Sequence, residues 1–160
     1  MCIRDSLYGL GYNANGTLGN NTRDATYPGY SSPIQIGTNT NWRSLDNKNS
    51  SGTSYFMVAS KTDGTLWSWG LNSYGQLGQN LGGTPASLSS PVQIPGTWSK
   101  AYTGQSATVA IKTNGELWMW GVNTSGQLGQ NSISSSFGGY SSPVQVPGTC
   151  LLYTSDAADE

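Results

Sequence analysis

The chain has no histidine and carries little charge. Its 160 residues include seven basic and eight acidic side chains, together 9% of the sequence. Away from the two ends the only carboxylates are Asp24, Asp46, Asp63 and Glu116. Asp63 falls in a predicted turn and Glu116 opens a predicted strand, so they form no acid–base pair or metal cluster. The many hydroxyl side chains have no histidine to activate them. We therefore expect no catalytic residue, no metal and no cofactor, and we expect the chain not to be an enzyme.

Cysteine is confined to the two ends of the chain, which match a sequencing adapter. Residues 1–6 (MCIRDS) translate back to a transposon-derived adapter, and residues 150–160 (CLLYTSDAADE) to its reverse complement continued outward. We expect both segments to be adapter-derived tags and exclude them from the fold. Residues 7–149 then hold six basic and four acidic side chains. So small an excess predicts neither an acidic nor a basic partner.

Long apolar runs and clusters of basic residues are also missing. No apolar run approaches the ~18 residues of a membrane span, so no span is predicted. A phosphate-binding stripe would need clustered positive charge, and nucleic acid is therefore not an expected partner. The basic residues between the ends are scattered: Arg23, Arg43, Lys48, Lys61, Lys100 and Lys112.

What the sequence does contain is a repeat. Residues 66–78 (LWSWGLNSYGQLG) return as 117–129 (LWMWGVNTSGQLG), and 7–19 (LYGLGYNANGTLG) are a looser copy, with steps of 59 and 51 residues. A Ser-Ser-Pro motif recurs in nearly the same register. A period of about 50 residues is typical of β-propeller blades or long helical repeats. Frequent glycine and proline, without amphipathic helical patterns, exclude the helical option. We predict three repeats, at 7–65, 66–116 and 117–149.

Each repeat predicts a hairpin followed by a compact turn. β-rich runs flank Asp63-Gly64 and Asn114-Gly115, pairs that favour a type I′ turn. Both faces of the hairpin strands are mostly apolar, which predicts sheets stacked face to face. Strands starting at the prolines of Ser-Ser-Pro are expected at sheet edges, where a missing N–H costs least. With a fourth strand near residues 42–45 and 98–102, each repeat has the strand count of a propeller blade.

The repeated signature supplies the candidate site residues, all of them predicted to be structural. Its glycines favour left-handed backbone angles, and its asparagine can bond its own backbone around a buried leucine. The residues are Trp67, Trp69, Gly70, Asn72, Gly75, Gln76, Leu77 and Gly78, then Trp118, Trp120, Gly121, Asn123, Gly126, Gln127, Leu128 and Gly129, with the hairpin turns at Asp63, Gly64, Asn114 and Gly115.

Leu-Trp-x-Trp followed by Gly-x-Asn-x-x-Gly-Gln-Leu-Gly resembles the regulator of chromosome condensation repeat family. The resemblance implies an all-β fold: a fragment with about three four-stranded antiparallel blades of a seven-bladed propeller. Family repeats usually carry a histidine where Phe56 and Ala107 stand here, which places this chain among divergent bacterial-type or viral copies. The family's founder promotes nucleotide exchange on a small nuclear GTPase and binds chromatin, but no residue of this chain can be matched to those functions.

The predicted function is a noncatalytic scaffold whose variable loops, 20–30, 81–88 and 132–140, bind another protein. One alternative is lectin-like carbohydrate binding through aromatic residues at blade ends, for which Trp42 and Trp98 are the better-placed tryptophans. A further alternative is nucleotide exchange on a small GTPase by the full-length parent. Low charge with abundant Gly, Ser, Asn and Thr favours an extracellular, cell-envelope or virion-surface location.

Overall fold

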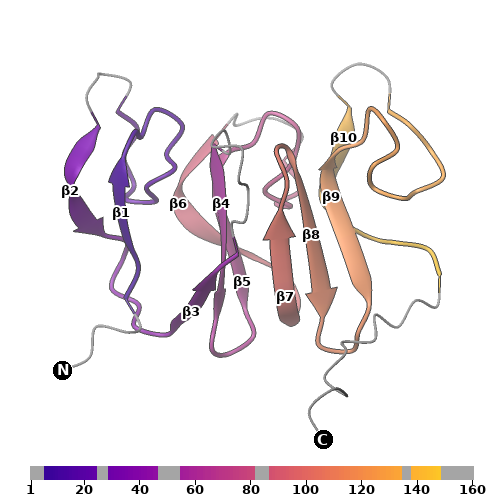
Figure 1. The fold of residues 1–160 in the computed structure, drawn as a ribbon, viewed down its shortest axis with the longest axis horizontal. Coiled ribbons are helices and arrows are strands. Elements are labelled where there is room, and N and C mark those ends of the chain that lie inside the picture. The colour runs from indigo at the N-terminus through magenta and orange to yellow at the C-terminus, as the bar shows by residue number, and fades with distance from the viewer. Residues whose placement is uncertain (1–5, 25–28, 47–54, 82–86, 135–137, 149–160) are drawn as a thin grey trace, which may run out of the picture.

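The computed structural model describes residues 6–24, 29–46, 55–81, 87–134 and 138–148. Within these residues every regular element is a β-strand, and the strands form three antiparallel sheets that lie side by side (Figure 1). The described part of the chain holds no helix with the length and apolar character to cross a membrane. Apart from Ser6, the predicted adapter segments lie outside the described residues.

The strands follow one another in each sheet in the order of the sequence. The first sheet pairs β1 (Tyr8–Gly11) with β2 (Tyr30–Gln35). The second sheet contains β3 (Trp42–Leu45), β4 (Phe56–Lys61), β5 (Leu66–Leu71) and β6 (Ser87–Ile94). The third sheet contains β7 (Trp98–Thr103), β8 (Ala107–Lys112), β9 (Leu117–Val122) and β10 (Gly139–Gln145). All connections within a sheet are therefore simple hairpins or longer loops between neighbours.

The predicted fold class, an all-β fragment of a β-propeller, is confirmed. We expected about three four-stranded sheets. The described residues form two four-stranded sheets and one two-stranded sheet. The difference follows from where the signature lies: its copies begin at β1, β5 and β9, and in the complete sheets this is the third strand. The boundaries at 66 and 117 thus mark the sequence period, whereas the sheets themselves begin at Trp42 and Trp98.

The hairpin turns lie at the predicted positions but have a different geometry. The Lys61 N–H donates to the Thr65 carbonyl at 2.9 Å, and the Gly64 N–H donates to the Lys61 carbonyl at 3.1 Å. Gly64 has a φ of 81°, while Asp63 is not among the residues with positive φ. A type I′ turn needs positive φ at both central residues, so that prediction is wrong. The loop is a three-residue hairpin connection, a type I turn that ends in a left-handed glycine.

The side chain before the glycine gives the physical reason. Asp63 Oδ1 accepts a hydrogen bond from the Thr65 N–H at 2.9 Å, and Asn114 Oδ1 accepts one from the Glu116 N–H at 3.2 Å. Such local bonds satisfy the N–H that follows the glycine. Only the glycine then has to adopt left-handed angles, as Gly115 does with a φ of 86°.

The Ser-Ser-Pro motif forms a bulge in the last strand of each sheet. Residues 89–91 lie opposite the single residue Trp69, and residues 141–143 lie opposite Trp120. Bulged residues leave the hydrogen-bond ladder, so the missing N–H of proline costs little there. The predicted edge position is confirmed, but β2, β6 and β10 begin at least three residues before their prolines. The pairing starts earlier than predicted because the bulge interrupts the ladder without ending it.

The apolar core lies between the sheets. One cluster joins the second and third sheets and includes Phe56, Val58 and Trp120, each 0% exposed. The other joins the first and second sheets around Trp69 and Ile36. Both faces of the second sheet are thus buried, as the two-sided apolar pattern of its strands predicts.

Substitutions at two glycines can distinguish the cost of backbone strain from the cost of steric overlap. Gly70 has a φ of +98°, and a Cβ added there would lie 2.5 Å from the Tyr55 carbonyl oxygen, whereas at Gly64 (φ +81°) the nearest atom would be 3.9 Å away. We expect Gly70→Ala to lower the free energy of unfolding by about 3 kcal/mol, from left-handed strain plus overlap. Gly64→Ala should cost about 1 kcal/mol, from strain alone. Urea denaturation measures both, and equal losses would contradict the role of the close approach.

Candidate functional site

Each copy of the signature folds into a turn that one asparagine holds together. We call residues 13–21, 72–80 and 123–131 the signature turns. Asn72 Oδ1 accepts a hydrogen bond from the Leu77 N–H at 3.1 Å, and its Nδ2 donates to the Leu81 carbonyl at 3.1 Å. Asn123 repeats the first bond with Leu128 at 3.1 Å. Both asparagines and both leucines are 0% exposed. The buried side-chain amide therefore forms the hydrogen bonds that water would otherwise make to backbone groups left unpaired in a tight turn.

The second tryptophan of each complete signature binds the signature turn of the preceding sheet. Trp69 Nε1 donates to the Thr17 carbonyl at 2.8 Å, and Trp120 Nε1 donates to the Gln76 carbonyl at 2.9 Å. The Gln76 carbonyl also accepts a hydrogen bond from Thr108 Oγ1 at 2.9 Å. These bonds connect neighbouring sheets. The repeated indole therefore stabilises the contact between two repeats and not the interior of one repeat.

A second bond pair joins the end of each of the first two signature turns to the bulge of the next sheet. Asn80 (φ 55°) donates its backbone N–H to the Ser141 carbonyl at 2.7 Å, and Ser142 Oγ donates to Asn80 Oδ1 at 3.0 Å. Asn21 makes the same two bonds to the bulge at 89–91, at 2.8 and 3.1 Å. The bulge leaves these serine groups free for a partner, which explains why the signature and Ser-Ser-Pro keep register.

Sequence reasoning missed these left-handed asparagines. Asn21, Asn80 and Asn131 have φ values of 64°, 55° and 51°. Each stands two residues after the Leu-Gly that ends a signature copy. That recurrence, with the known tolerance of asparagine for left-handed angles, is the signal that could have found them.

The glycines of the signature allow the sheets to approach. A Cβ on Gly75 would lie 2.6 Å from Ser141 Cα, and a Cβ on Gly78 would lie 2.7 Å from Trp120 Nε1. Both glycines also have positive φ. Two independent constraints, backbone angle and contact with the neighbouring sheet, thus act on the same residues.

The remaining tryptophans enclose a lysine in each complete sheet. Lys61 Nζ lies 4.7 Å from the Trp42 ring and 4.0 Å from the Trp67 ring, and Lys112 Nζ lies 3.7 Å from the Trp118 ring. Burial lowers the pKa of Lys61 from its ordinary value of 10.5, an effect that the Asp63 carboxylate partly offsets. The charge is stabilised by the ring faces at the cost of hydration.

Trp42 and Trp98 do not form an exposed aromatic platform. They are 6% and 1% exposed, and their rings pack edge-on or tilted against the other indoles of their sheets. The prediction that these two tryptophans are the better-placed candidates for carbohydrate binding is therefore wrong. Both residues begin the first strand of a sheet, and the lysine and the neighbouring indoles cover them.

Tyrosine gathers at the opposite end of the strands. The strands β5 and β9 end, and β4 and β8 begin, along the upper rim of the sheets in Figure 1, and this row of strand ends is the edge meant here. Tyr12, Tyr55 and Tyr102 there are 46%, 44% and 38% exposed. We call the tyrosines at this edge the tyrosine edge: Tyr12, Tyr30, Tyr55, Tyr74, Tyr102 and Tyr140.

Two parts of the chain, residues 63–111 and 114–149, match the family model described as "Regulator of chromosome condensation (RCC1) repeat". A second model with that description matches residues 99–127. The chain belongs to the RCC1 repeat family.

Among curated proteins, the RCC1 repeats here resemble the Protein RCC2 homolog of Danio rerio, with 40% identity over 75 residues. They also resemble human Protein RCC2, with 34% identity over 89 residues. These matches cover 44% and 53% of this chain but only 14% and 16% of the relatives.

Solved structures share the fold. Human WBSCR16 has a TM-score of 0.67 at 22% identity, and Prp20p from Saccharomyces cerevisiae has a TM-score of 0.71 at 17% identity. Each comparison covers 90% of this chain and 34% of the other. Within the described residues of this RCC1-repeat chain, no group of three His, Cys, Asp or Glu residues could hold a metal ion.

The shared acceptor at Gln76 allows a double-mutant test. Trp120→Phe and Thr108→Val should each lower the free energy of unfolding by about 1 kcal/mol for the lost hydrogen bond, in addition to any packing loss. Together they leave the buried carbonyl without a donor, and we expect a loss about 1–2 kcal/mol greater than the sum. Chemical denaturation of the four proteins gives the coupling. Trp118→Phe with Thr108→Val is the control, because Trp118 donates to Glu116 instead; that pair should be additive.

The Asp63 turn predicts a dependence of stability on acid. Hydrogen bonds from the side chain and backbone of Thr65 lower the pKa of Asp63 from its ordinary value of 3.8. A carboxylate whose pKa is depressed on folding stabilises the protein above its unfolded pKa and loses that contribution as the pH falls through the folded value. We expect wild type to lose more stability than Asp63→Asn between about pH 5 and pH 2. Thermal melts across this range measure it, and parallel pH profiles would contradict the prediction.

Proposed function

We propose that this RCC1-repeat chain is a noncatalytic scaffold that binds another protein at the tyrosine edge. The single observation that carries the proposal is that three of the four exposed tyrosines in the described residues, Tyr12, Tyr55 and Tyr102, lie at one edge of the sheets. Tyrosine offers a large, rigid contact surface with a polar hydroxyl and is enriched at protein interfaces. The tryptophans, by contrast, are occupied in packing between and within the sheets.

The variable loops belong to the same proposal. The segments 20–30, 81–88 and 132–140 enter β2, β6 and β10 from this edge, although parts of each lie outside the described residues. Loops on a rigid scaffold are where binding residues commonly occur. A partner that contacts the tyrosines would therefore also meet segments that differ between the repeats.

Structural relatives support the class of partner. Prp20p is described with binding properties to Gsp1p and histones, and yeast RCC1 (Prp20) has been solved bound by Kap60. At 17% and 18% identity these likenesses extend to the fold. They favour a protein as the partner here, and they do not identify that protein. Nucleotide exchange on a small GTPase by a longer parent protein is the alternative function.

Site-specific photocrosslinking tests the proposal. A benzophenone amino acid placed at Tyr55 or Tyr102 should yield discrete protein adducts in a cell extract, and excess unlabelled chain should suppress them. Thr97 and Thr113 at the other edge are exposed and bond one another, so they provide matched control positions. Purified Gsp1p and histones serve as defined probes. Equal adducts from both edges, or adducts that resist competition, would contradict binding at the tyrosine edge.

A further inference from the structure

Two Asn-Gly pairs in the chain have different surroundings. Asn114-Gly115 lies at the end of the hairpin between β8 and β9, and Asn15-Gly16 lies in the first signature turn. Asparagine is a chemically labile residue, since its side-chain amide carbon can be attacked by the next backbone nitrogen. A following glycine favours that attack because it has no Cβ in the path. The structure then decides which of the two pairs can react.

The side chain of Asn114 is arranged for addition at its amide carbon. The residue is exposed, and the Glu116 N–H donates to Asn114 Oδ1 at 3.2 Å. A donor at this oxygen stabilises the negative charge that develops there when a nucleophile adds to the carbon. Within the described residues the amide nitrogen Nδ2 has no hydrogen bond that would hold it in place. The oxygen is therefore activated and the leaving nitrogen is unrestrained.

The attacking group is the backbone nitrogen of Gly115, whose N–H donates to the Lys112 carbonyl at 2.9 Å. This bond must open before the nitrogen can lose its proton and approach the side chain. In the described part of the chain Gly115 has no hydrogen bond to another sheet, so opening the loop breaks local bonds alone. Local openings of this kind cost much less free energy than global unfolding.

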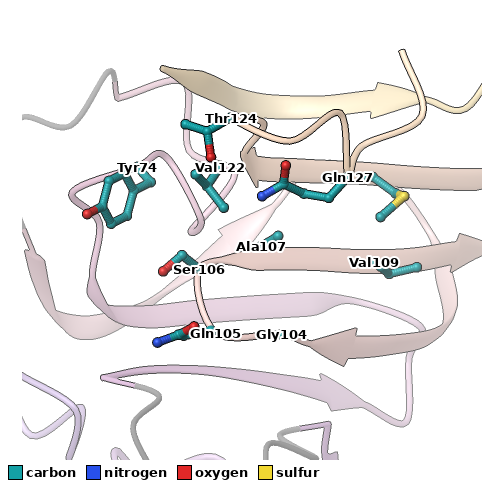
Figure 2. A pocket seen from close by; sticks show the side chains of 10 residues that line it. Tyr74, Gly104, Gln105, Ser106, Ala107, Val109, Val122, Thr124 and Gln127 are labelled. Carbon is teal, nitrogen blue, oxygen red and sulfur yellow. The ribbon is translucent and has the colours of Figure 1, made fainter. Parts of the chain in front are cut away.

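The hairpin that carries Asn114 is covered by the described residues on one face only. Ala110 and Trp120 pack against the second sheet and are 0% exposed. Ala107 and Val109 border a cavity of about 820 Å³ on the other side (Figure 2). The strands are thus confined from one side, and the loop that joins them has space in which to open.

Asn15-Gly16 lies instead in the contact between the first and second sheets. Gly16 is buried, and a Cβ added there would lie 2.7 Å from Ser89 Cα. The same signature turn is bonded to Ser89 a second time, because the Asn21 N–H donates to its carbonyl at 2.8 Å. A reaction at this pair would have to displace one sheet from the next.

We propose that Asn114 is a site of covalent modification, where the chain converts an asparagine into an acidic residue. The Gly115 nitrogen forms a bond to Asn114 Cγ, the bond from Cγ to Nδ2 breaks, and Nδ2 leaves as ammonia with the proton that the glycine nitrogen has lost. Water then adds to either carbonyl of the resulting cyclic imide and reopens the ring. The net reaction consumes water, releases ammonia and transfers no electrons.

The second repeat indicates how the hairpin accommodates the product. Asp63 stands at the place of Asn114, and its Oδ1 accepts the Thr65 N–H at 2.9 Å. An aspartate formed in the third repeat can keep the equivalent bond to Glu116, and it adds a negative charge. Ring opening at the backbone carbonyl gives isoaspartate, which lengthens the main chain by a carbon and disturbs the hairpin pairing. Both products form at the end of the strands opposite to the tyrosine edge.

Peptide mapping by mass spectrometry tests the proposal on the whole chain, incubated in mildly alkaline buffer. In the folded protein the Asn114 peptide should gain the mass of an amide-to-acid conversion about tenfold or more faster than the Asn15 peptide, because its loop opens locally. In concentrated urea the two rates should be similar, since both pairs are Asn-Gly. Equal rates in the folded protein overturn the proposal. So does a rate difference that persists in urea, which would come from flanking residues and not from the fold.

Asp63→Asn provides a matched variant. It places an Asn-Gly pair in the corresponding hairpin of the second repeat, where the Thr65 N–H is the donor to the side-chain oxygen. The folded variant should convert at position 63 faster than at Asn15, with Asn114 in the same sample as the reference. An unreactive pair at position 63 would overturn the role of the hairpin loop in the reaction.

Discussion

The hydrogen bond from a buried indole N–H to a turn carbonyl of the preceding sheet is the constraint on which the rest of this structure depends. It is made twice, by Trp69 and by Trp120. A buried indole needs an acceptor, and a buried carbonyl in a tight turn needs a donor. At each contact between sheets, one sheet supplies the indole donor and the other supplies the carbonyl acceptor. Two neighbouring sheets can therefore satisfy their polar groups only in one order and one register.

The other features of the repeat follow from this bond. The turn must present one carbonyl to the neighbouring sheet. Its remaining backbone groups are therefore bonded inside the turn, where the asparagine side chain accepts the N–H of the leucine that fills the centre. The sheets must approach closely, which excludes a Cβ at Gly75 and Gly78. The receiving strand must offer free serine groups, and a three-residue bulge beside the tryptophan provides them. An array of this kind is held by contacts between nearest neighbours, as repeat proteins generally are.

Packing between sheets also decides where binding residues can lie. The tryptophans near the hairpin ends pack against a lysine and against one another, so the indole rings at that end of the sheets face the core. The residues of the tyrosine edge lie at the other end of the sheets with part of their surface in solvent, and Tyr8, which begins β1, is an exposed tyrosine at the tryptophan end. The two edges thus differ although the sequence distributes both residue types through every repeat. The structure divides them because strand direction, and not composition, sets which end of a sheet a residue reaches.

Sequence alone determined the repeat, the antiparallel all-β class, the hairpin positions, and the burial of Leu77 and Leu128. These depend on local patterns: a period near 50 residues, apolar residues on both strand faces, and turn residues at fixed places. It could not give the turn type at Asp63, because the choice between two compact turns rests on a side-chain bond two residues away. Nor could it show that Trp42 and Trp98 are buried, or that Asn21 and Asn80 contact another sheet. Those outcomes needed the tertiary structure, since the partners of each group lie far along the chain and come together only when one sheet packs on the next.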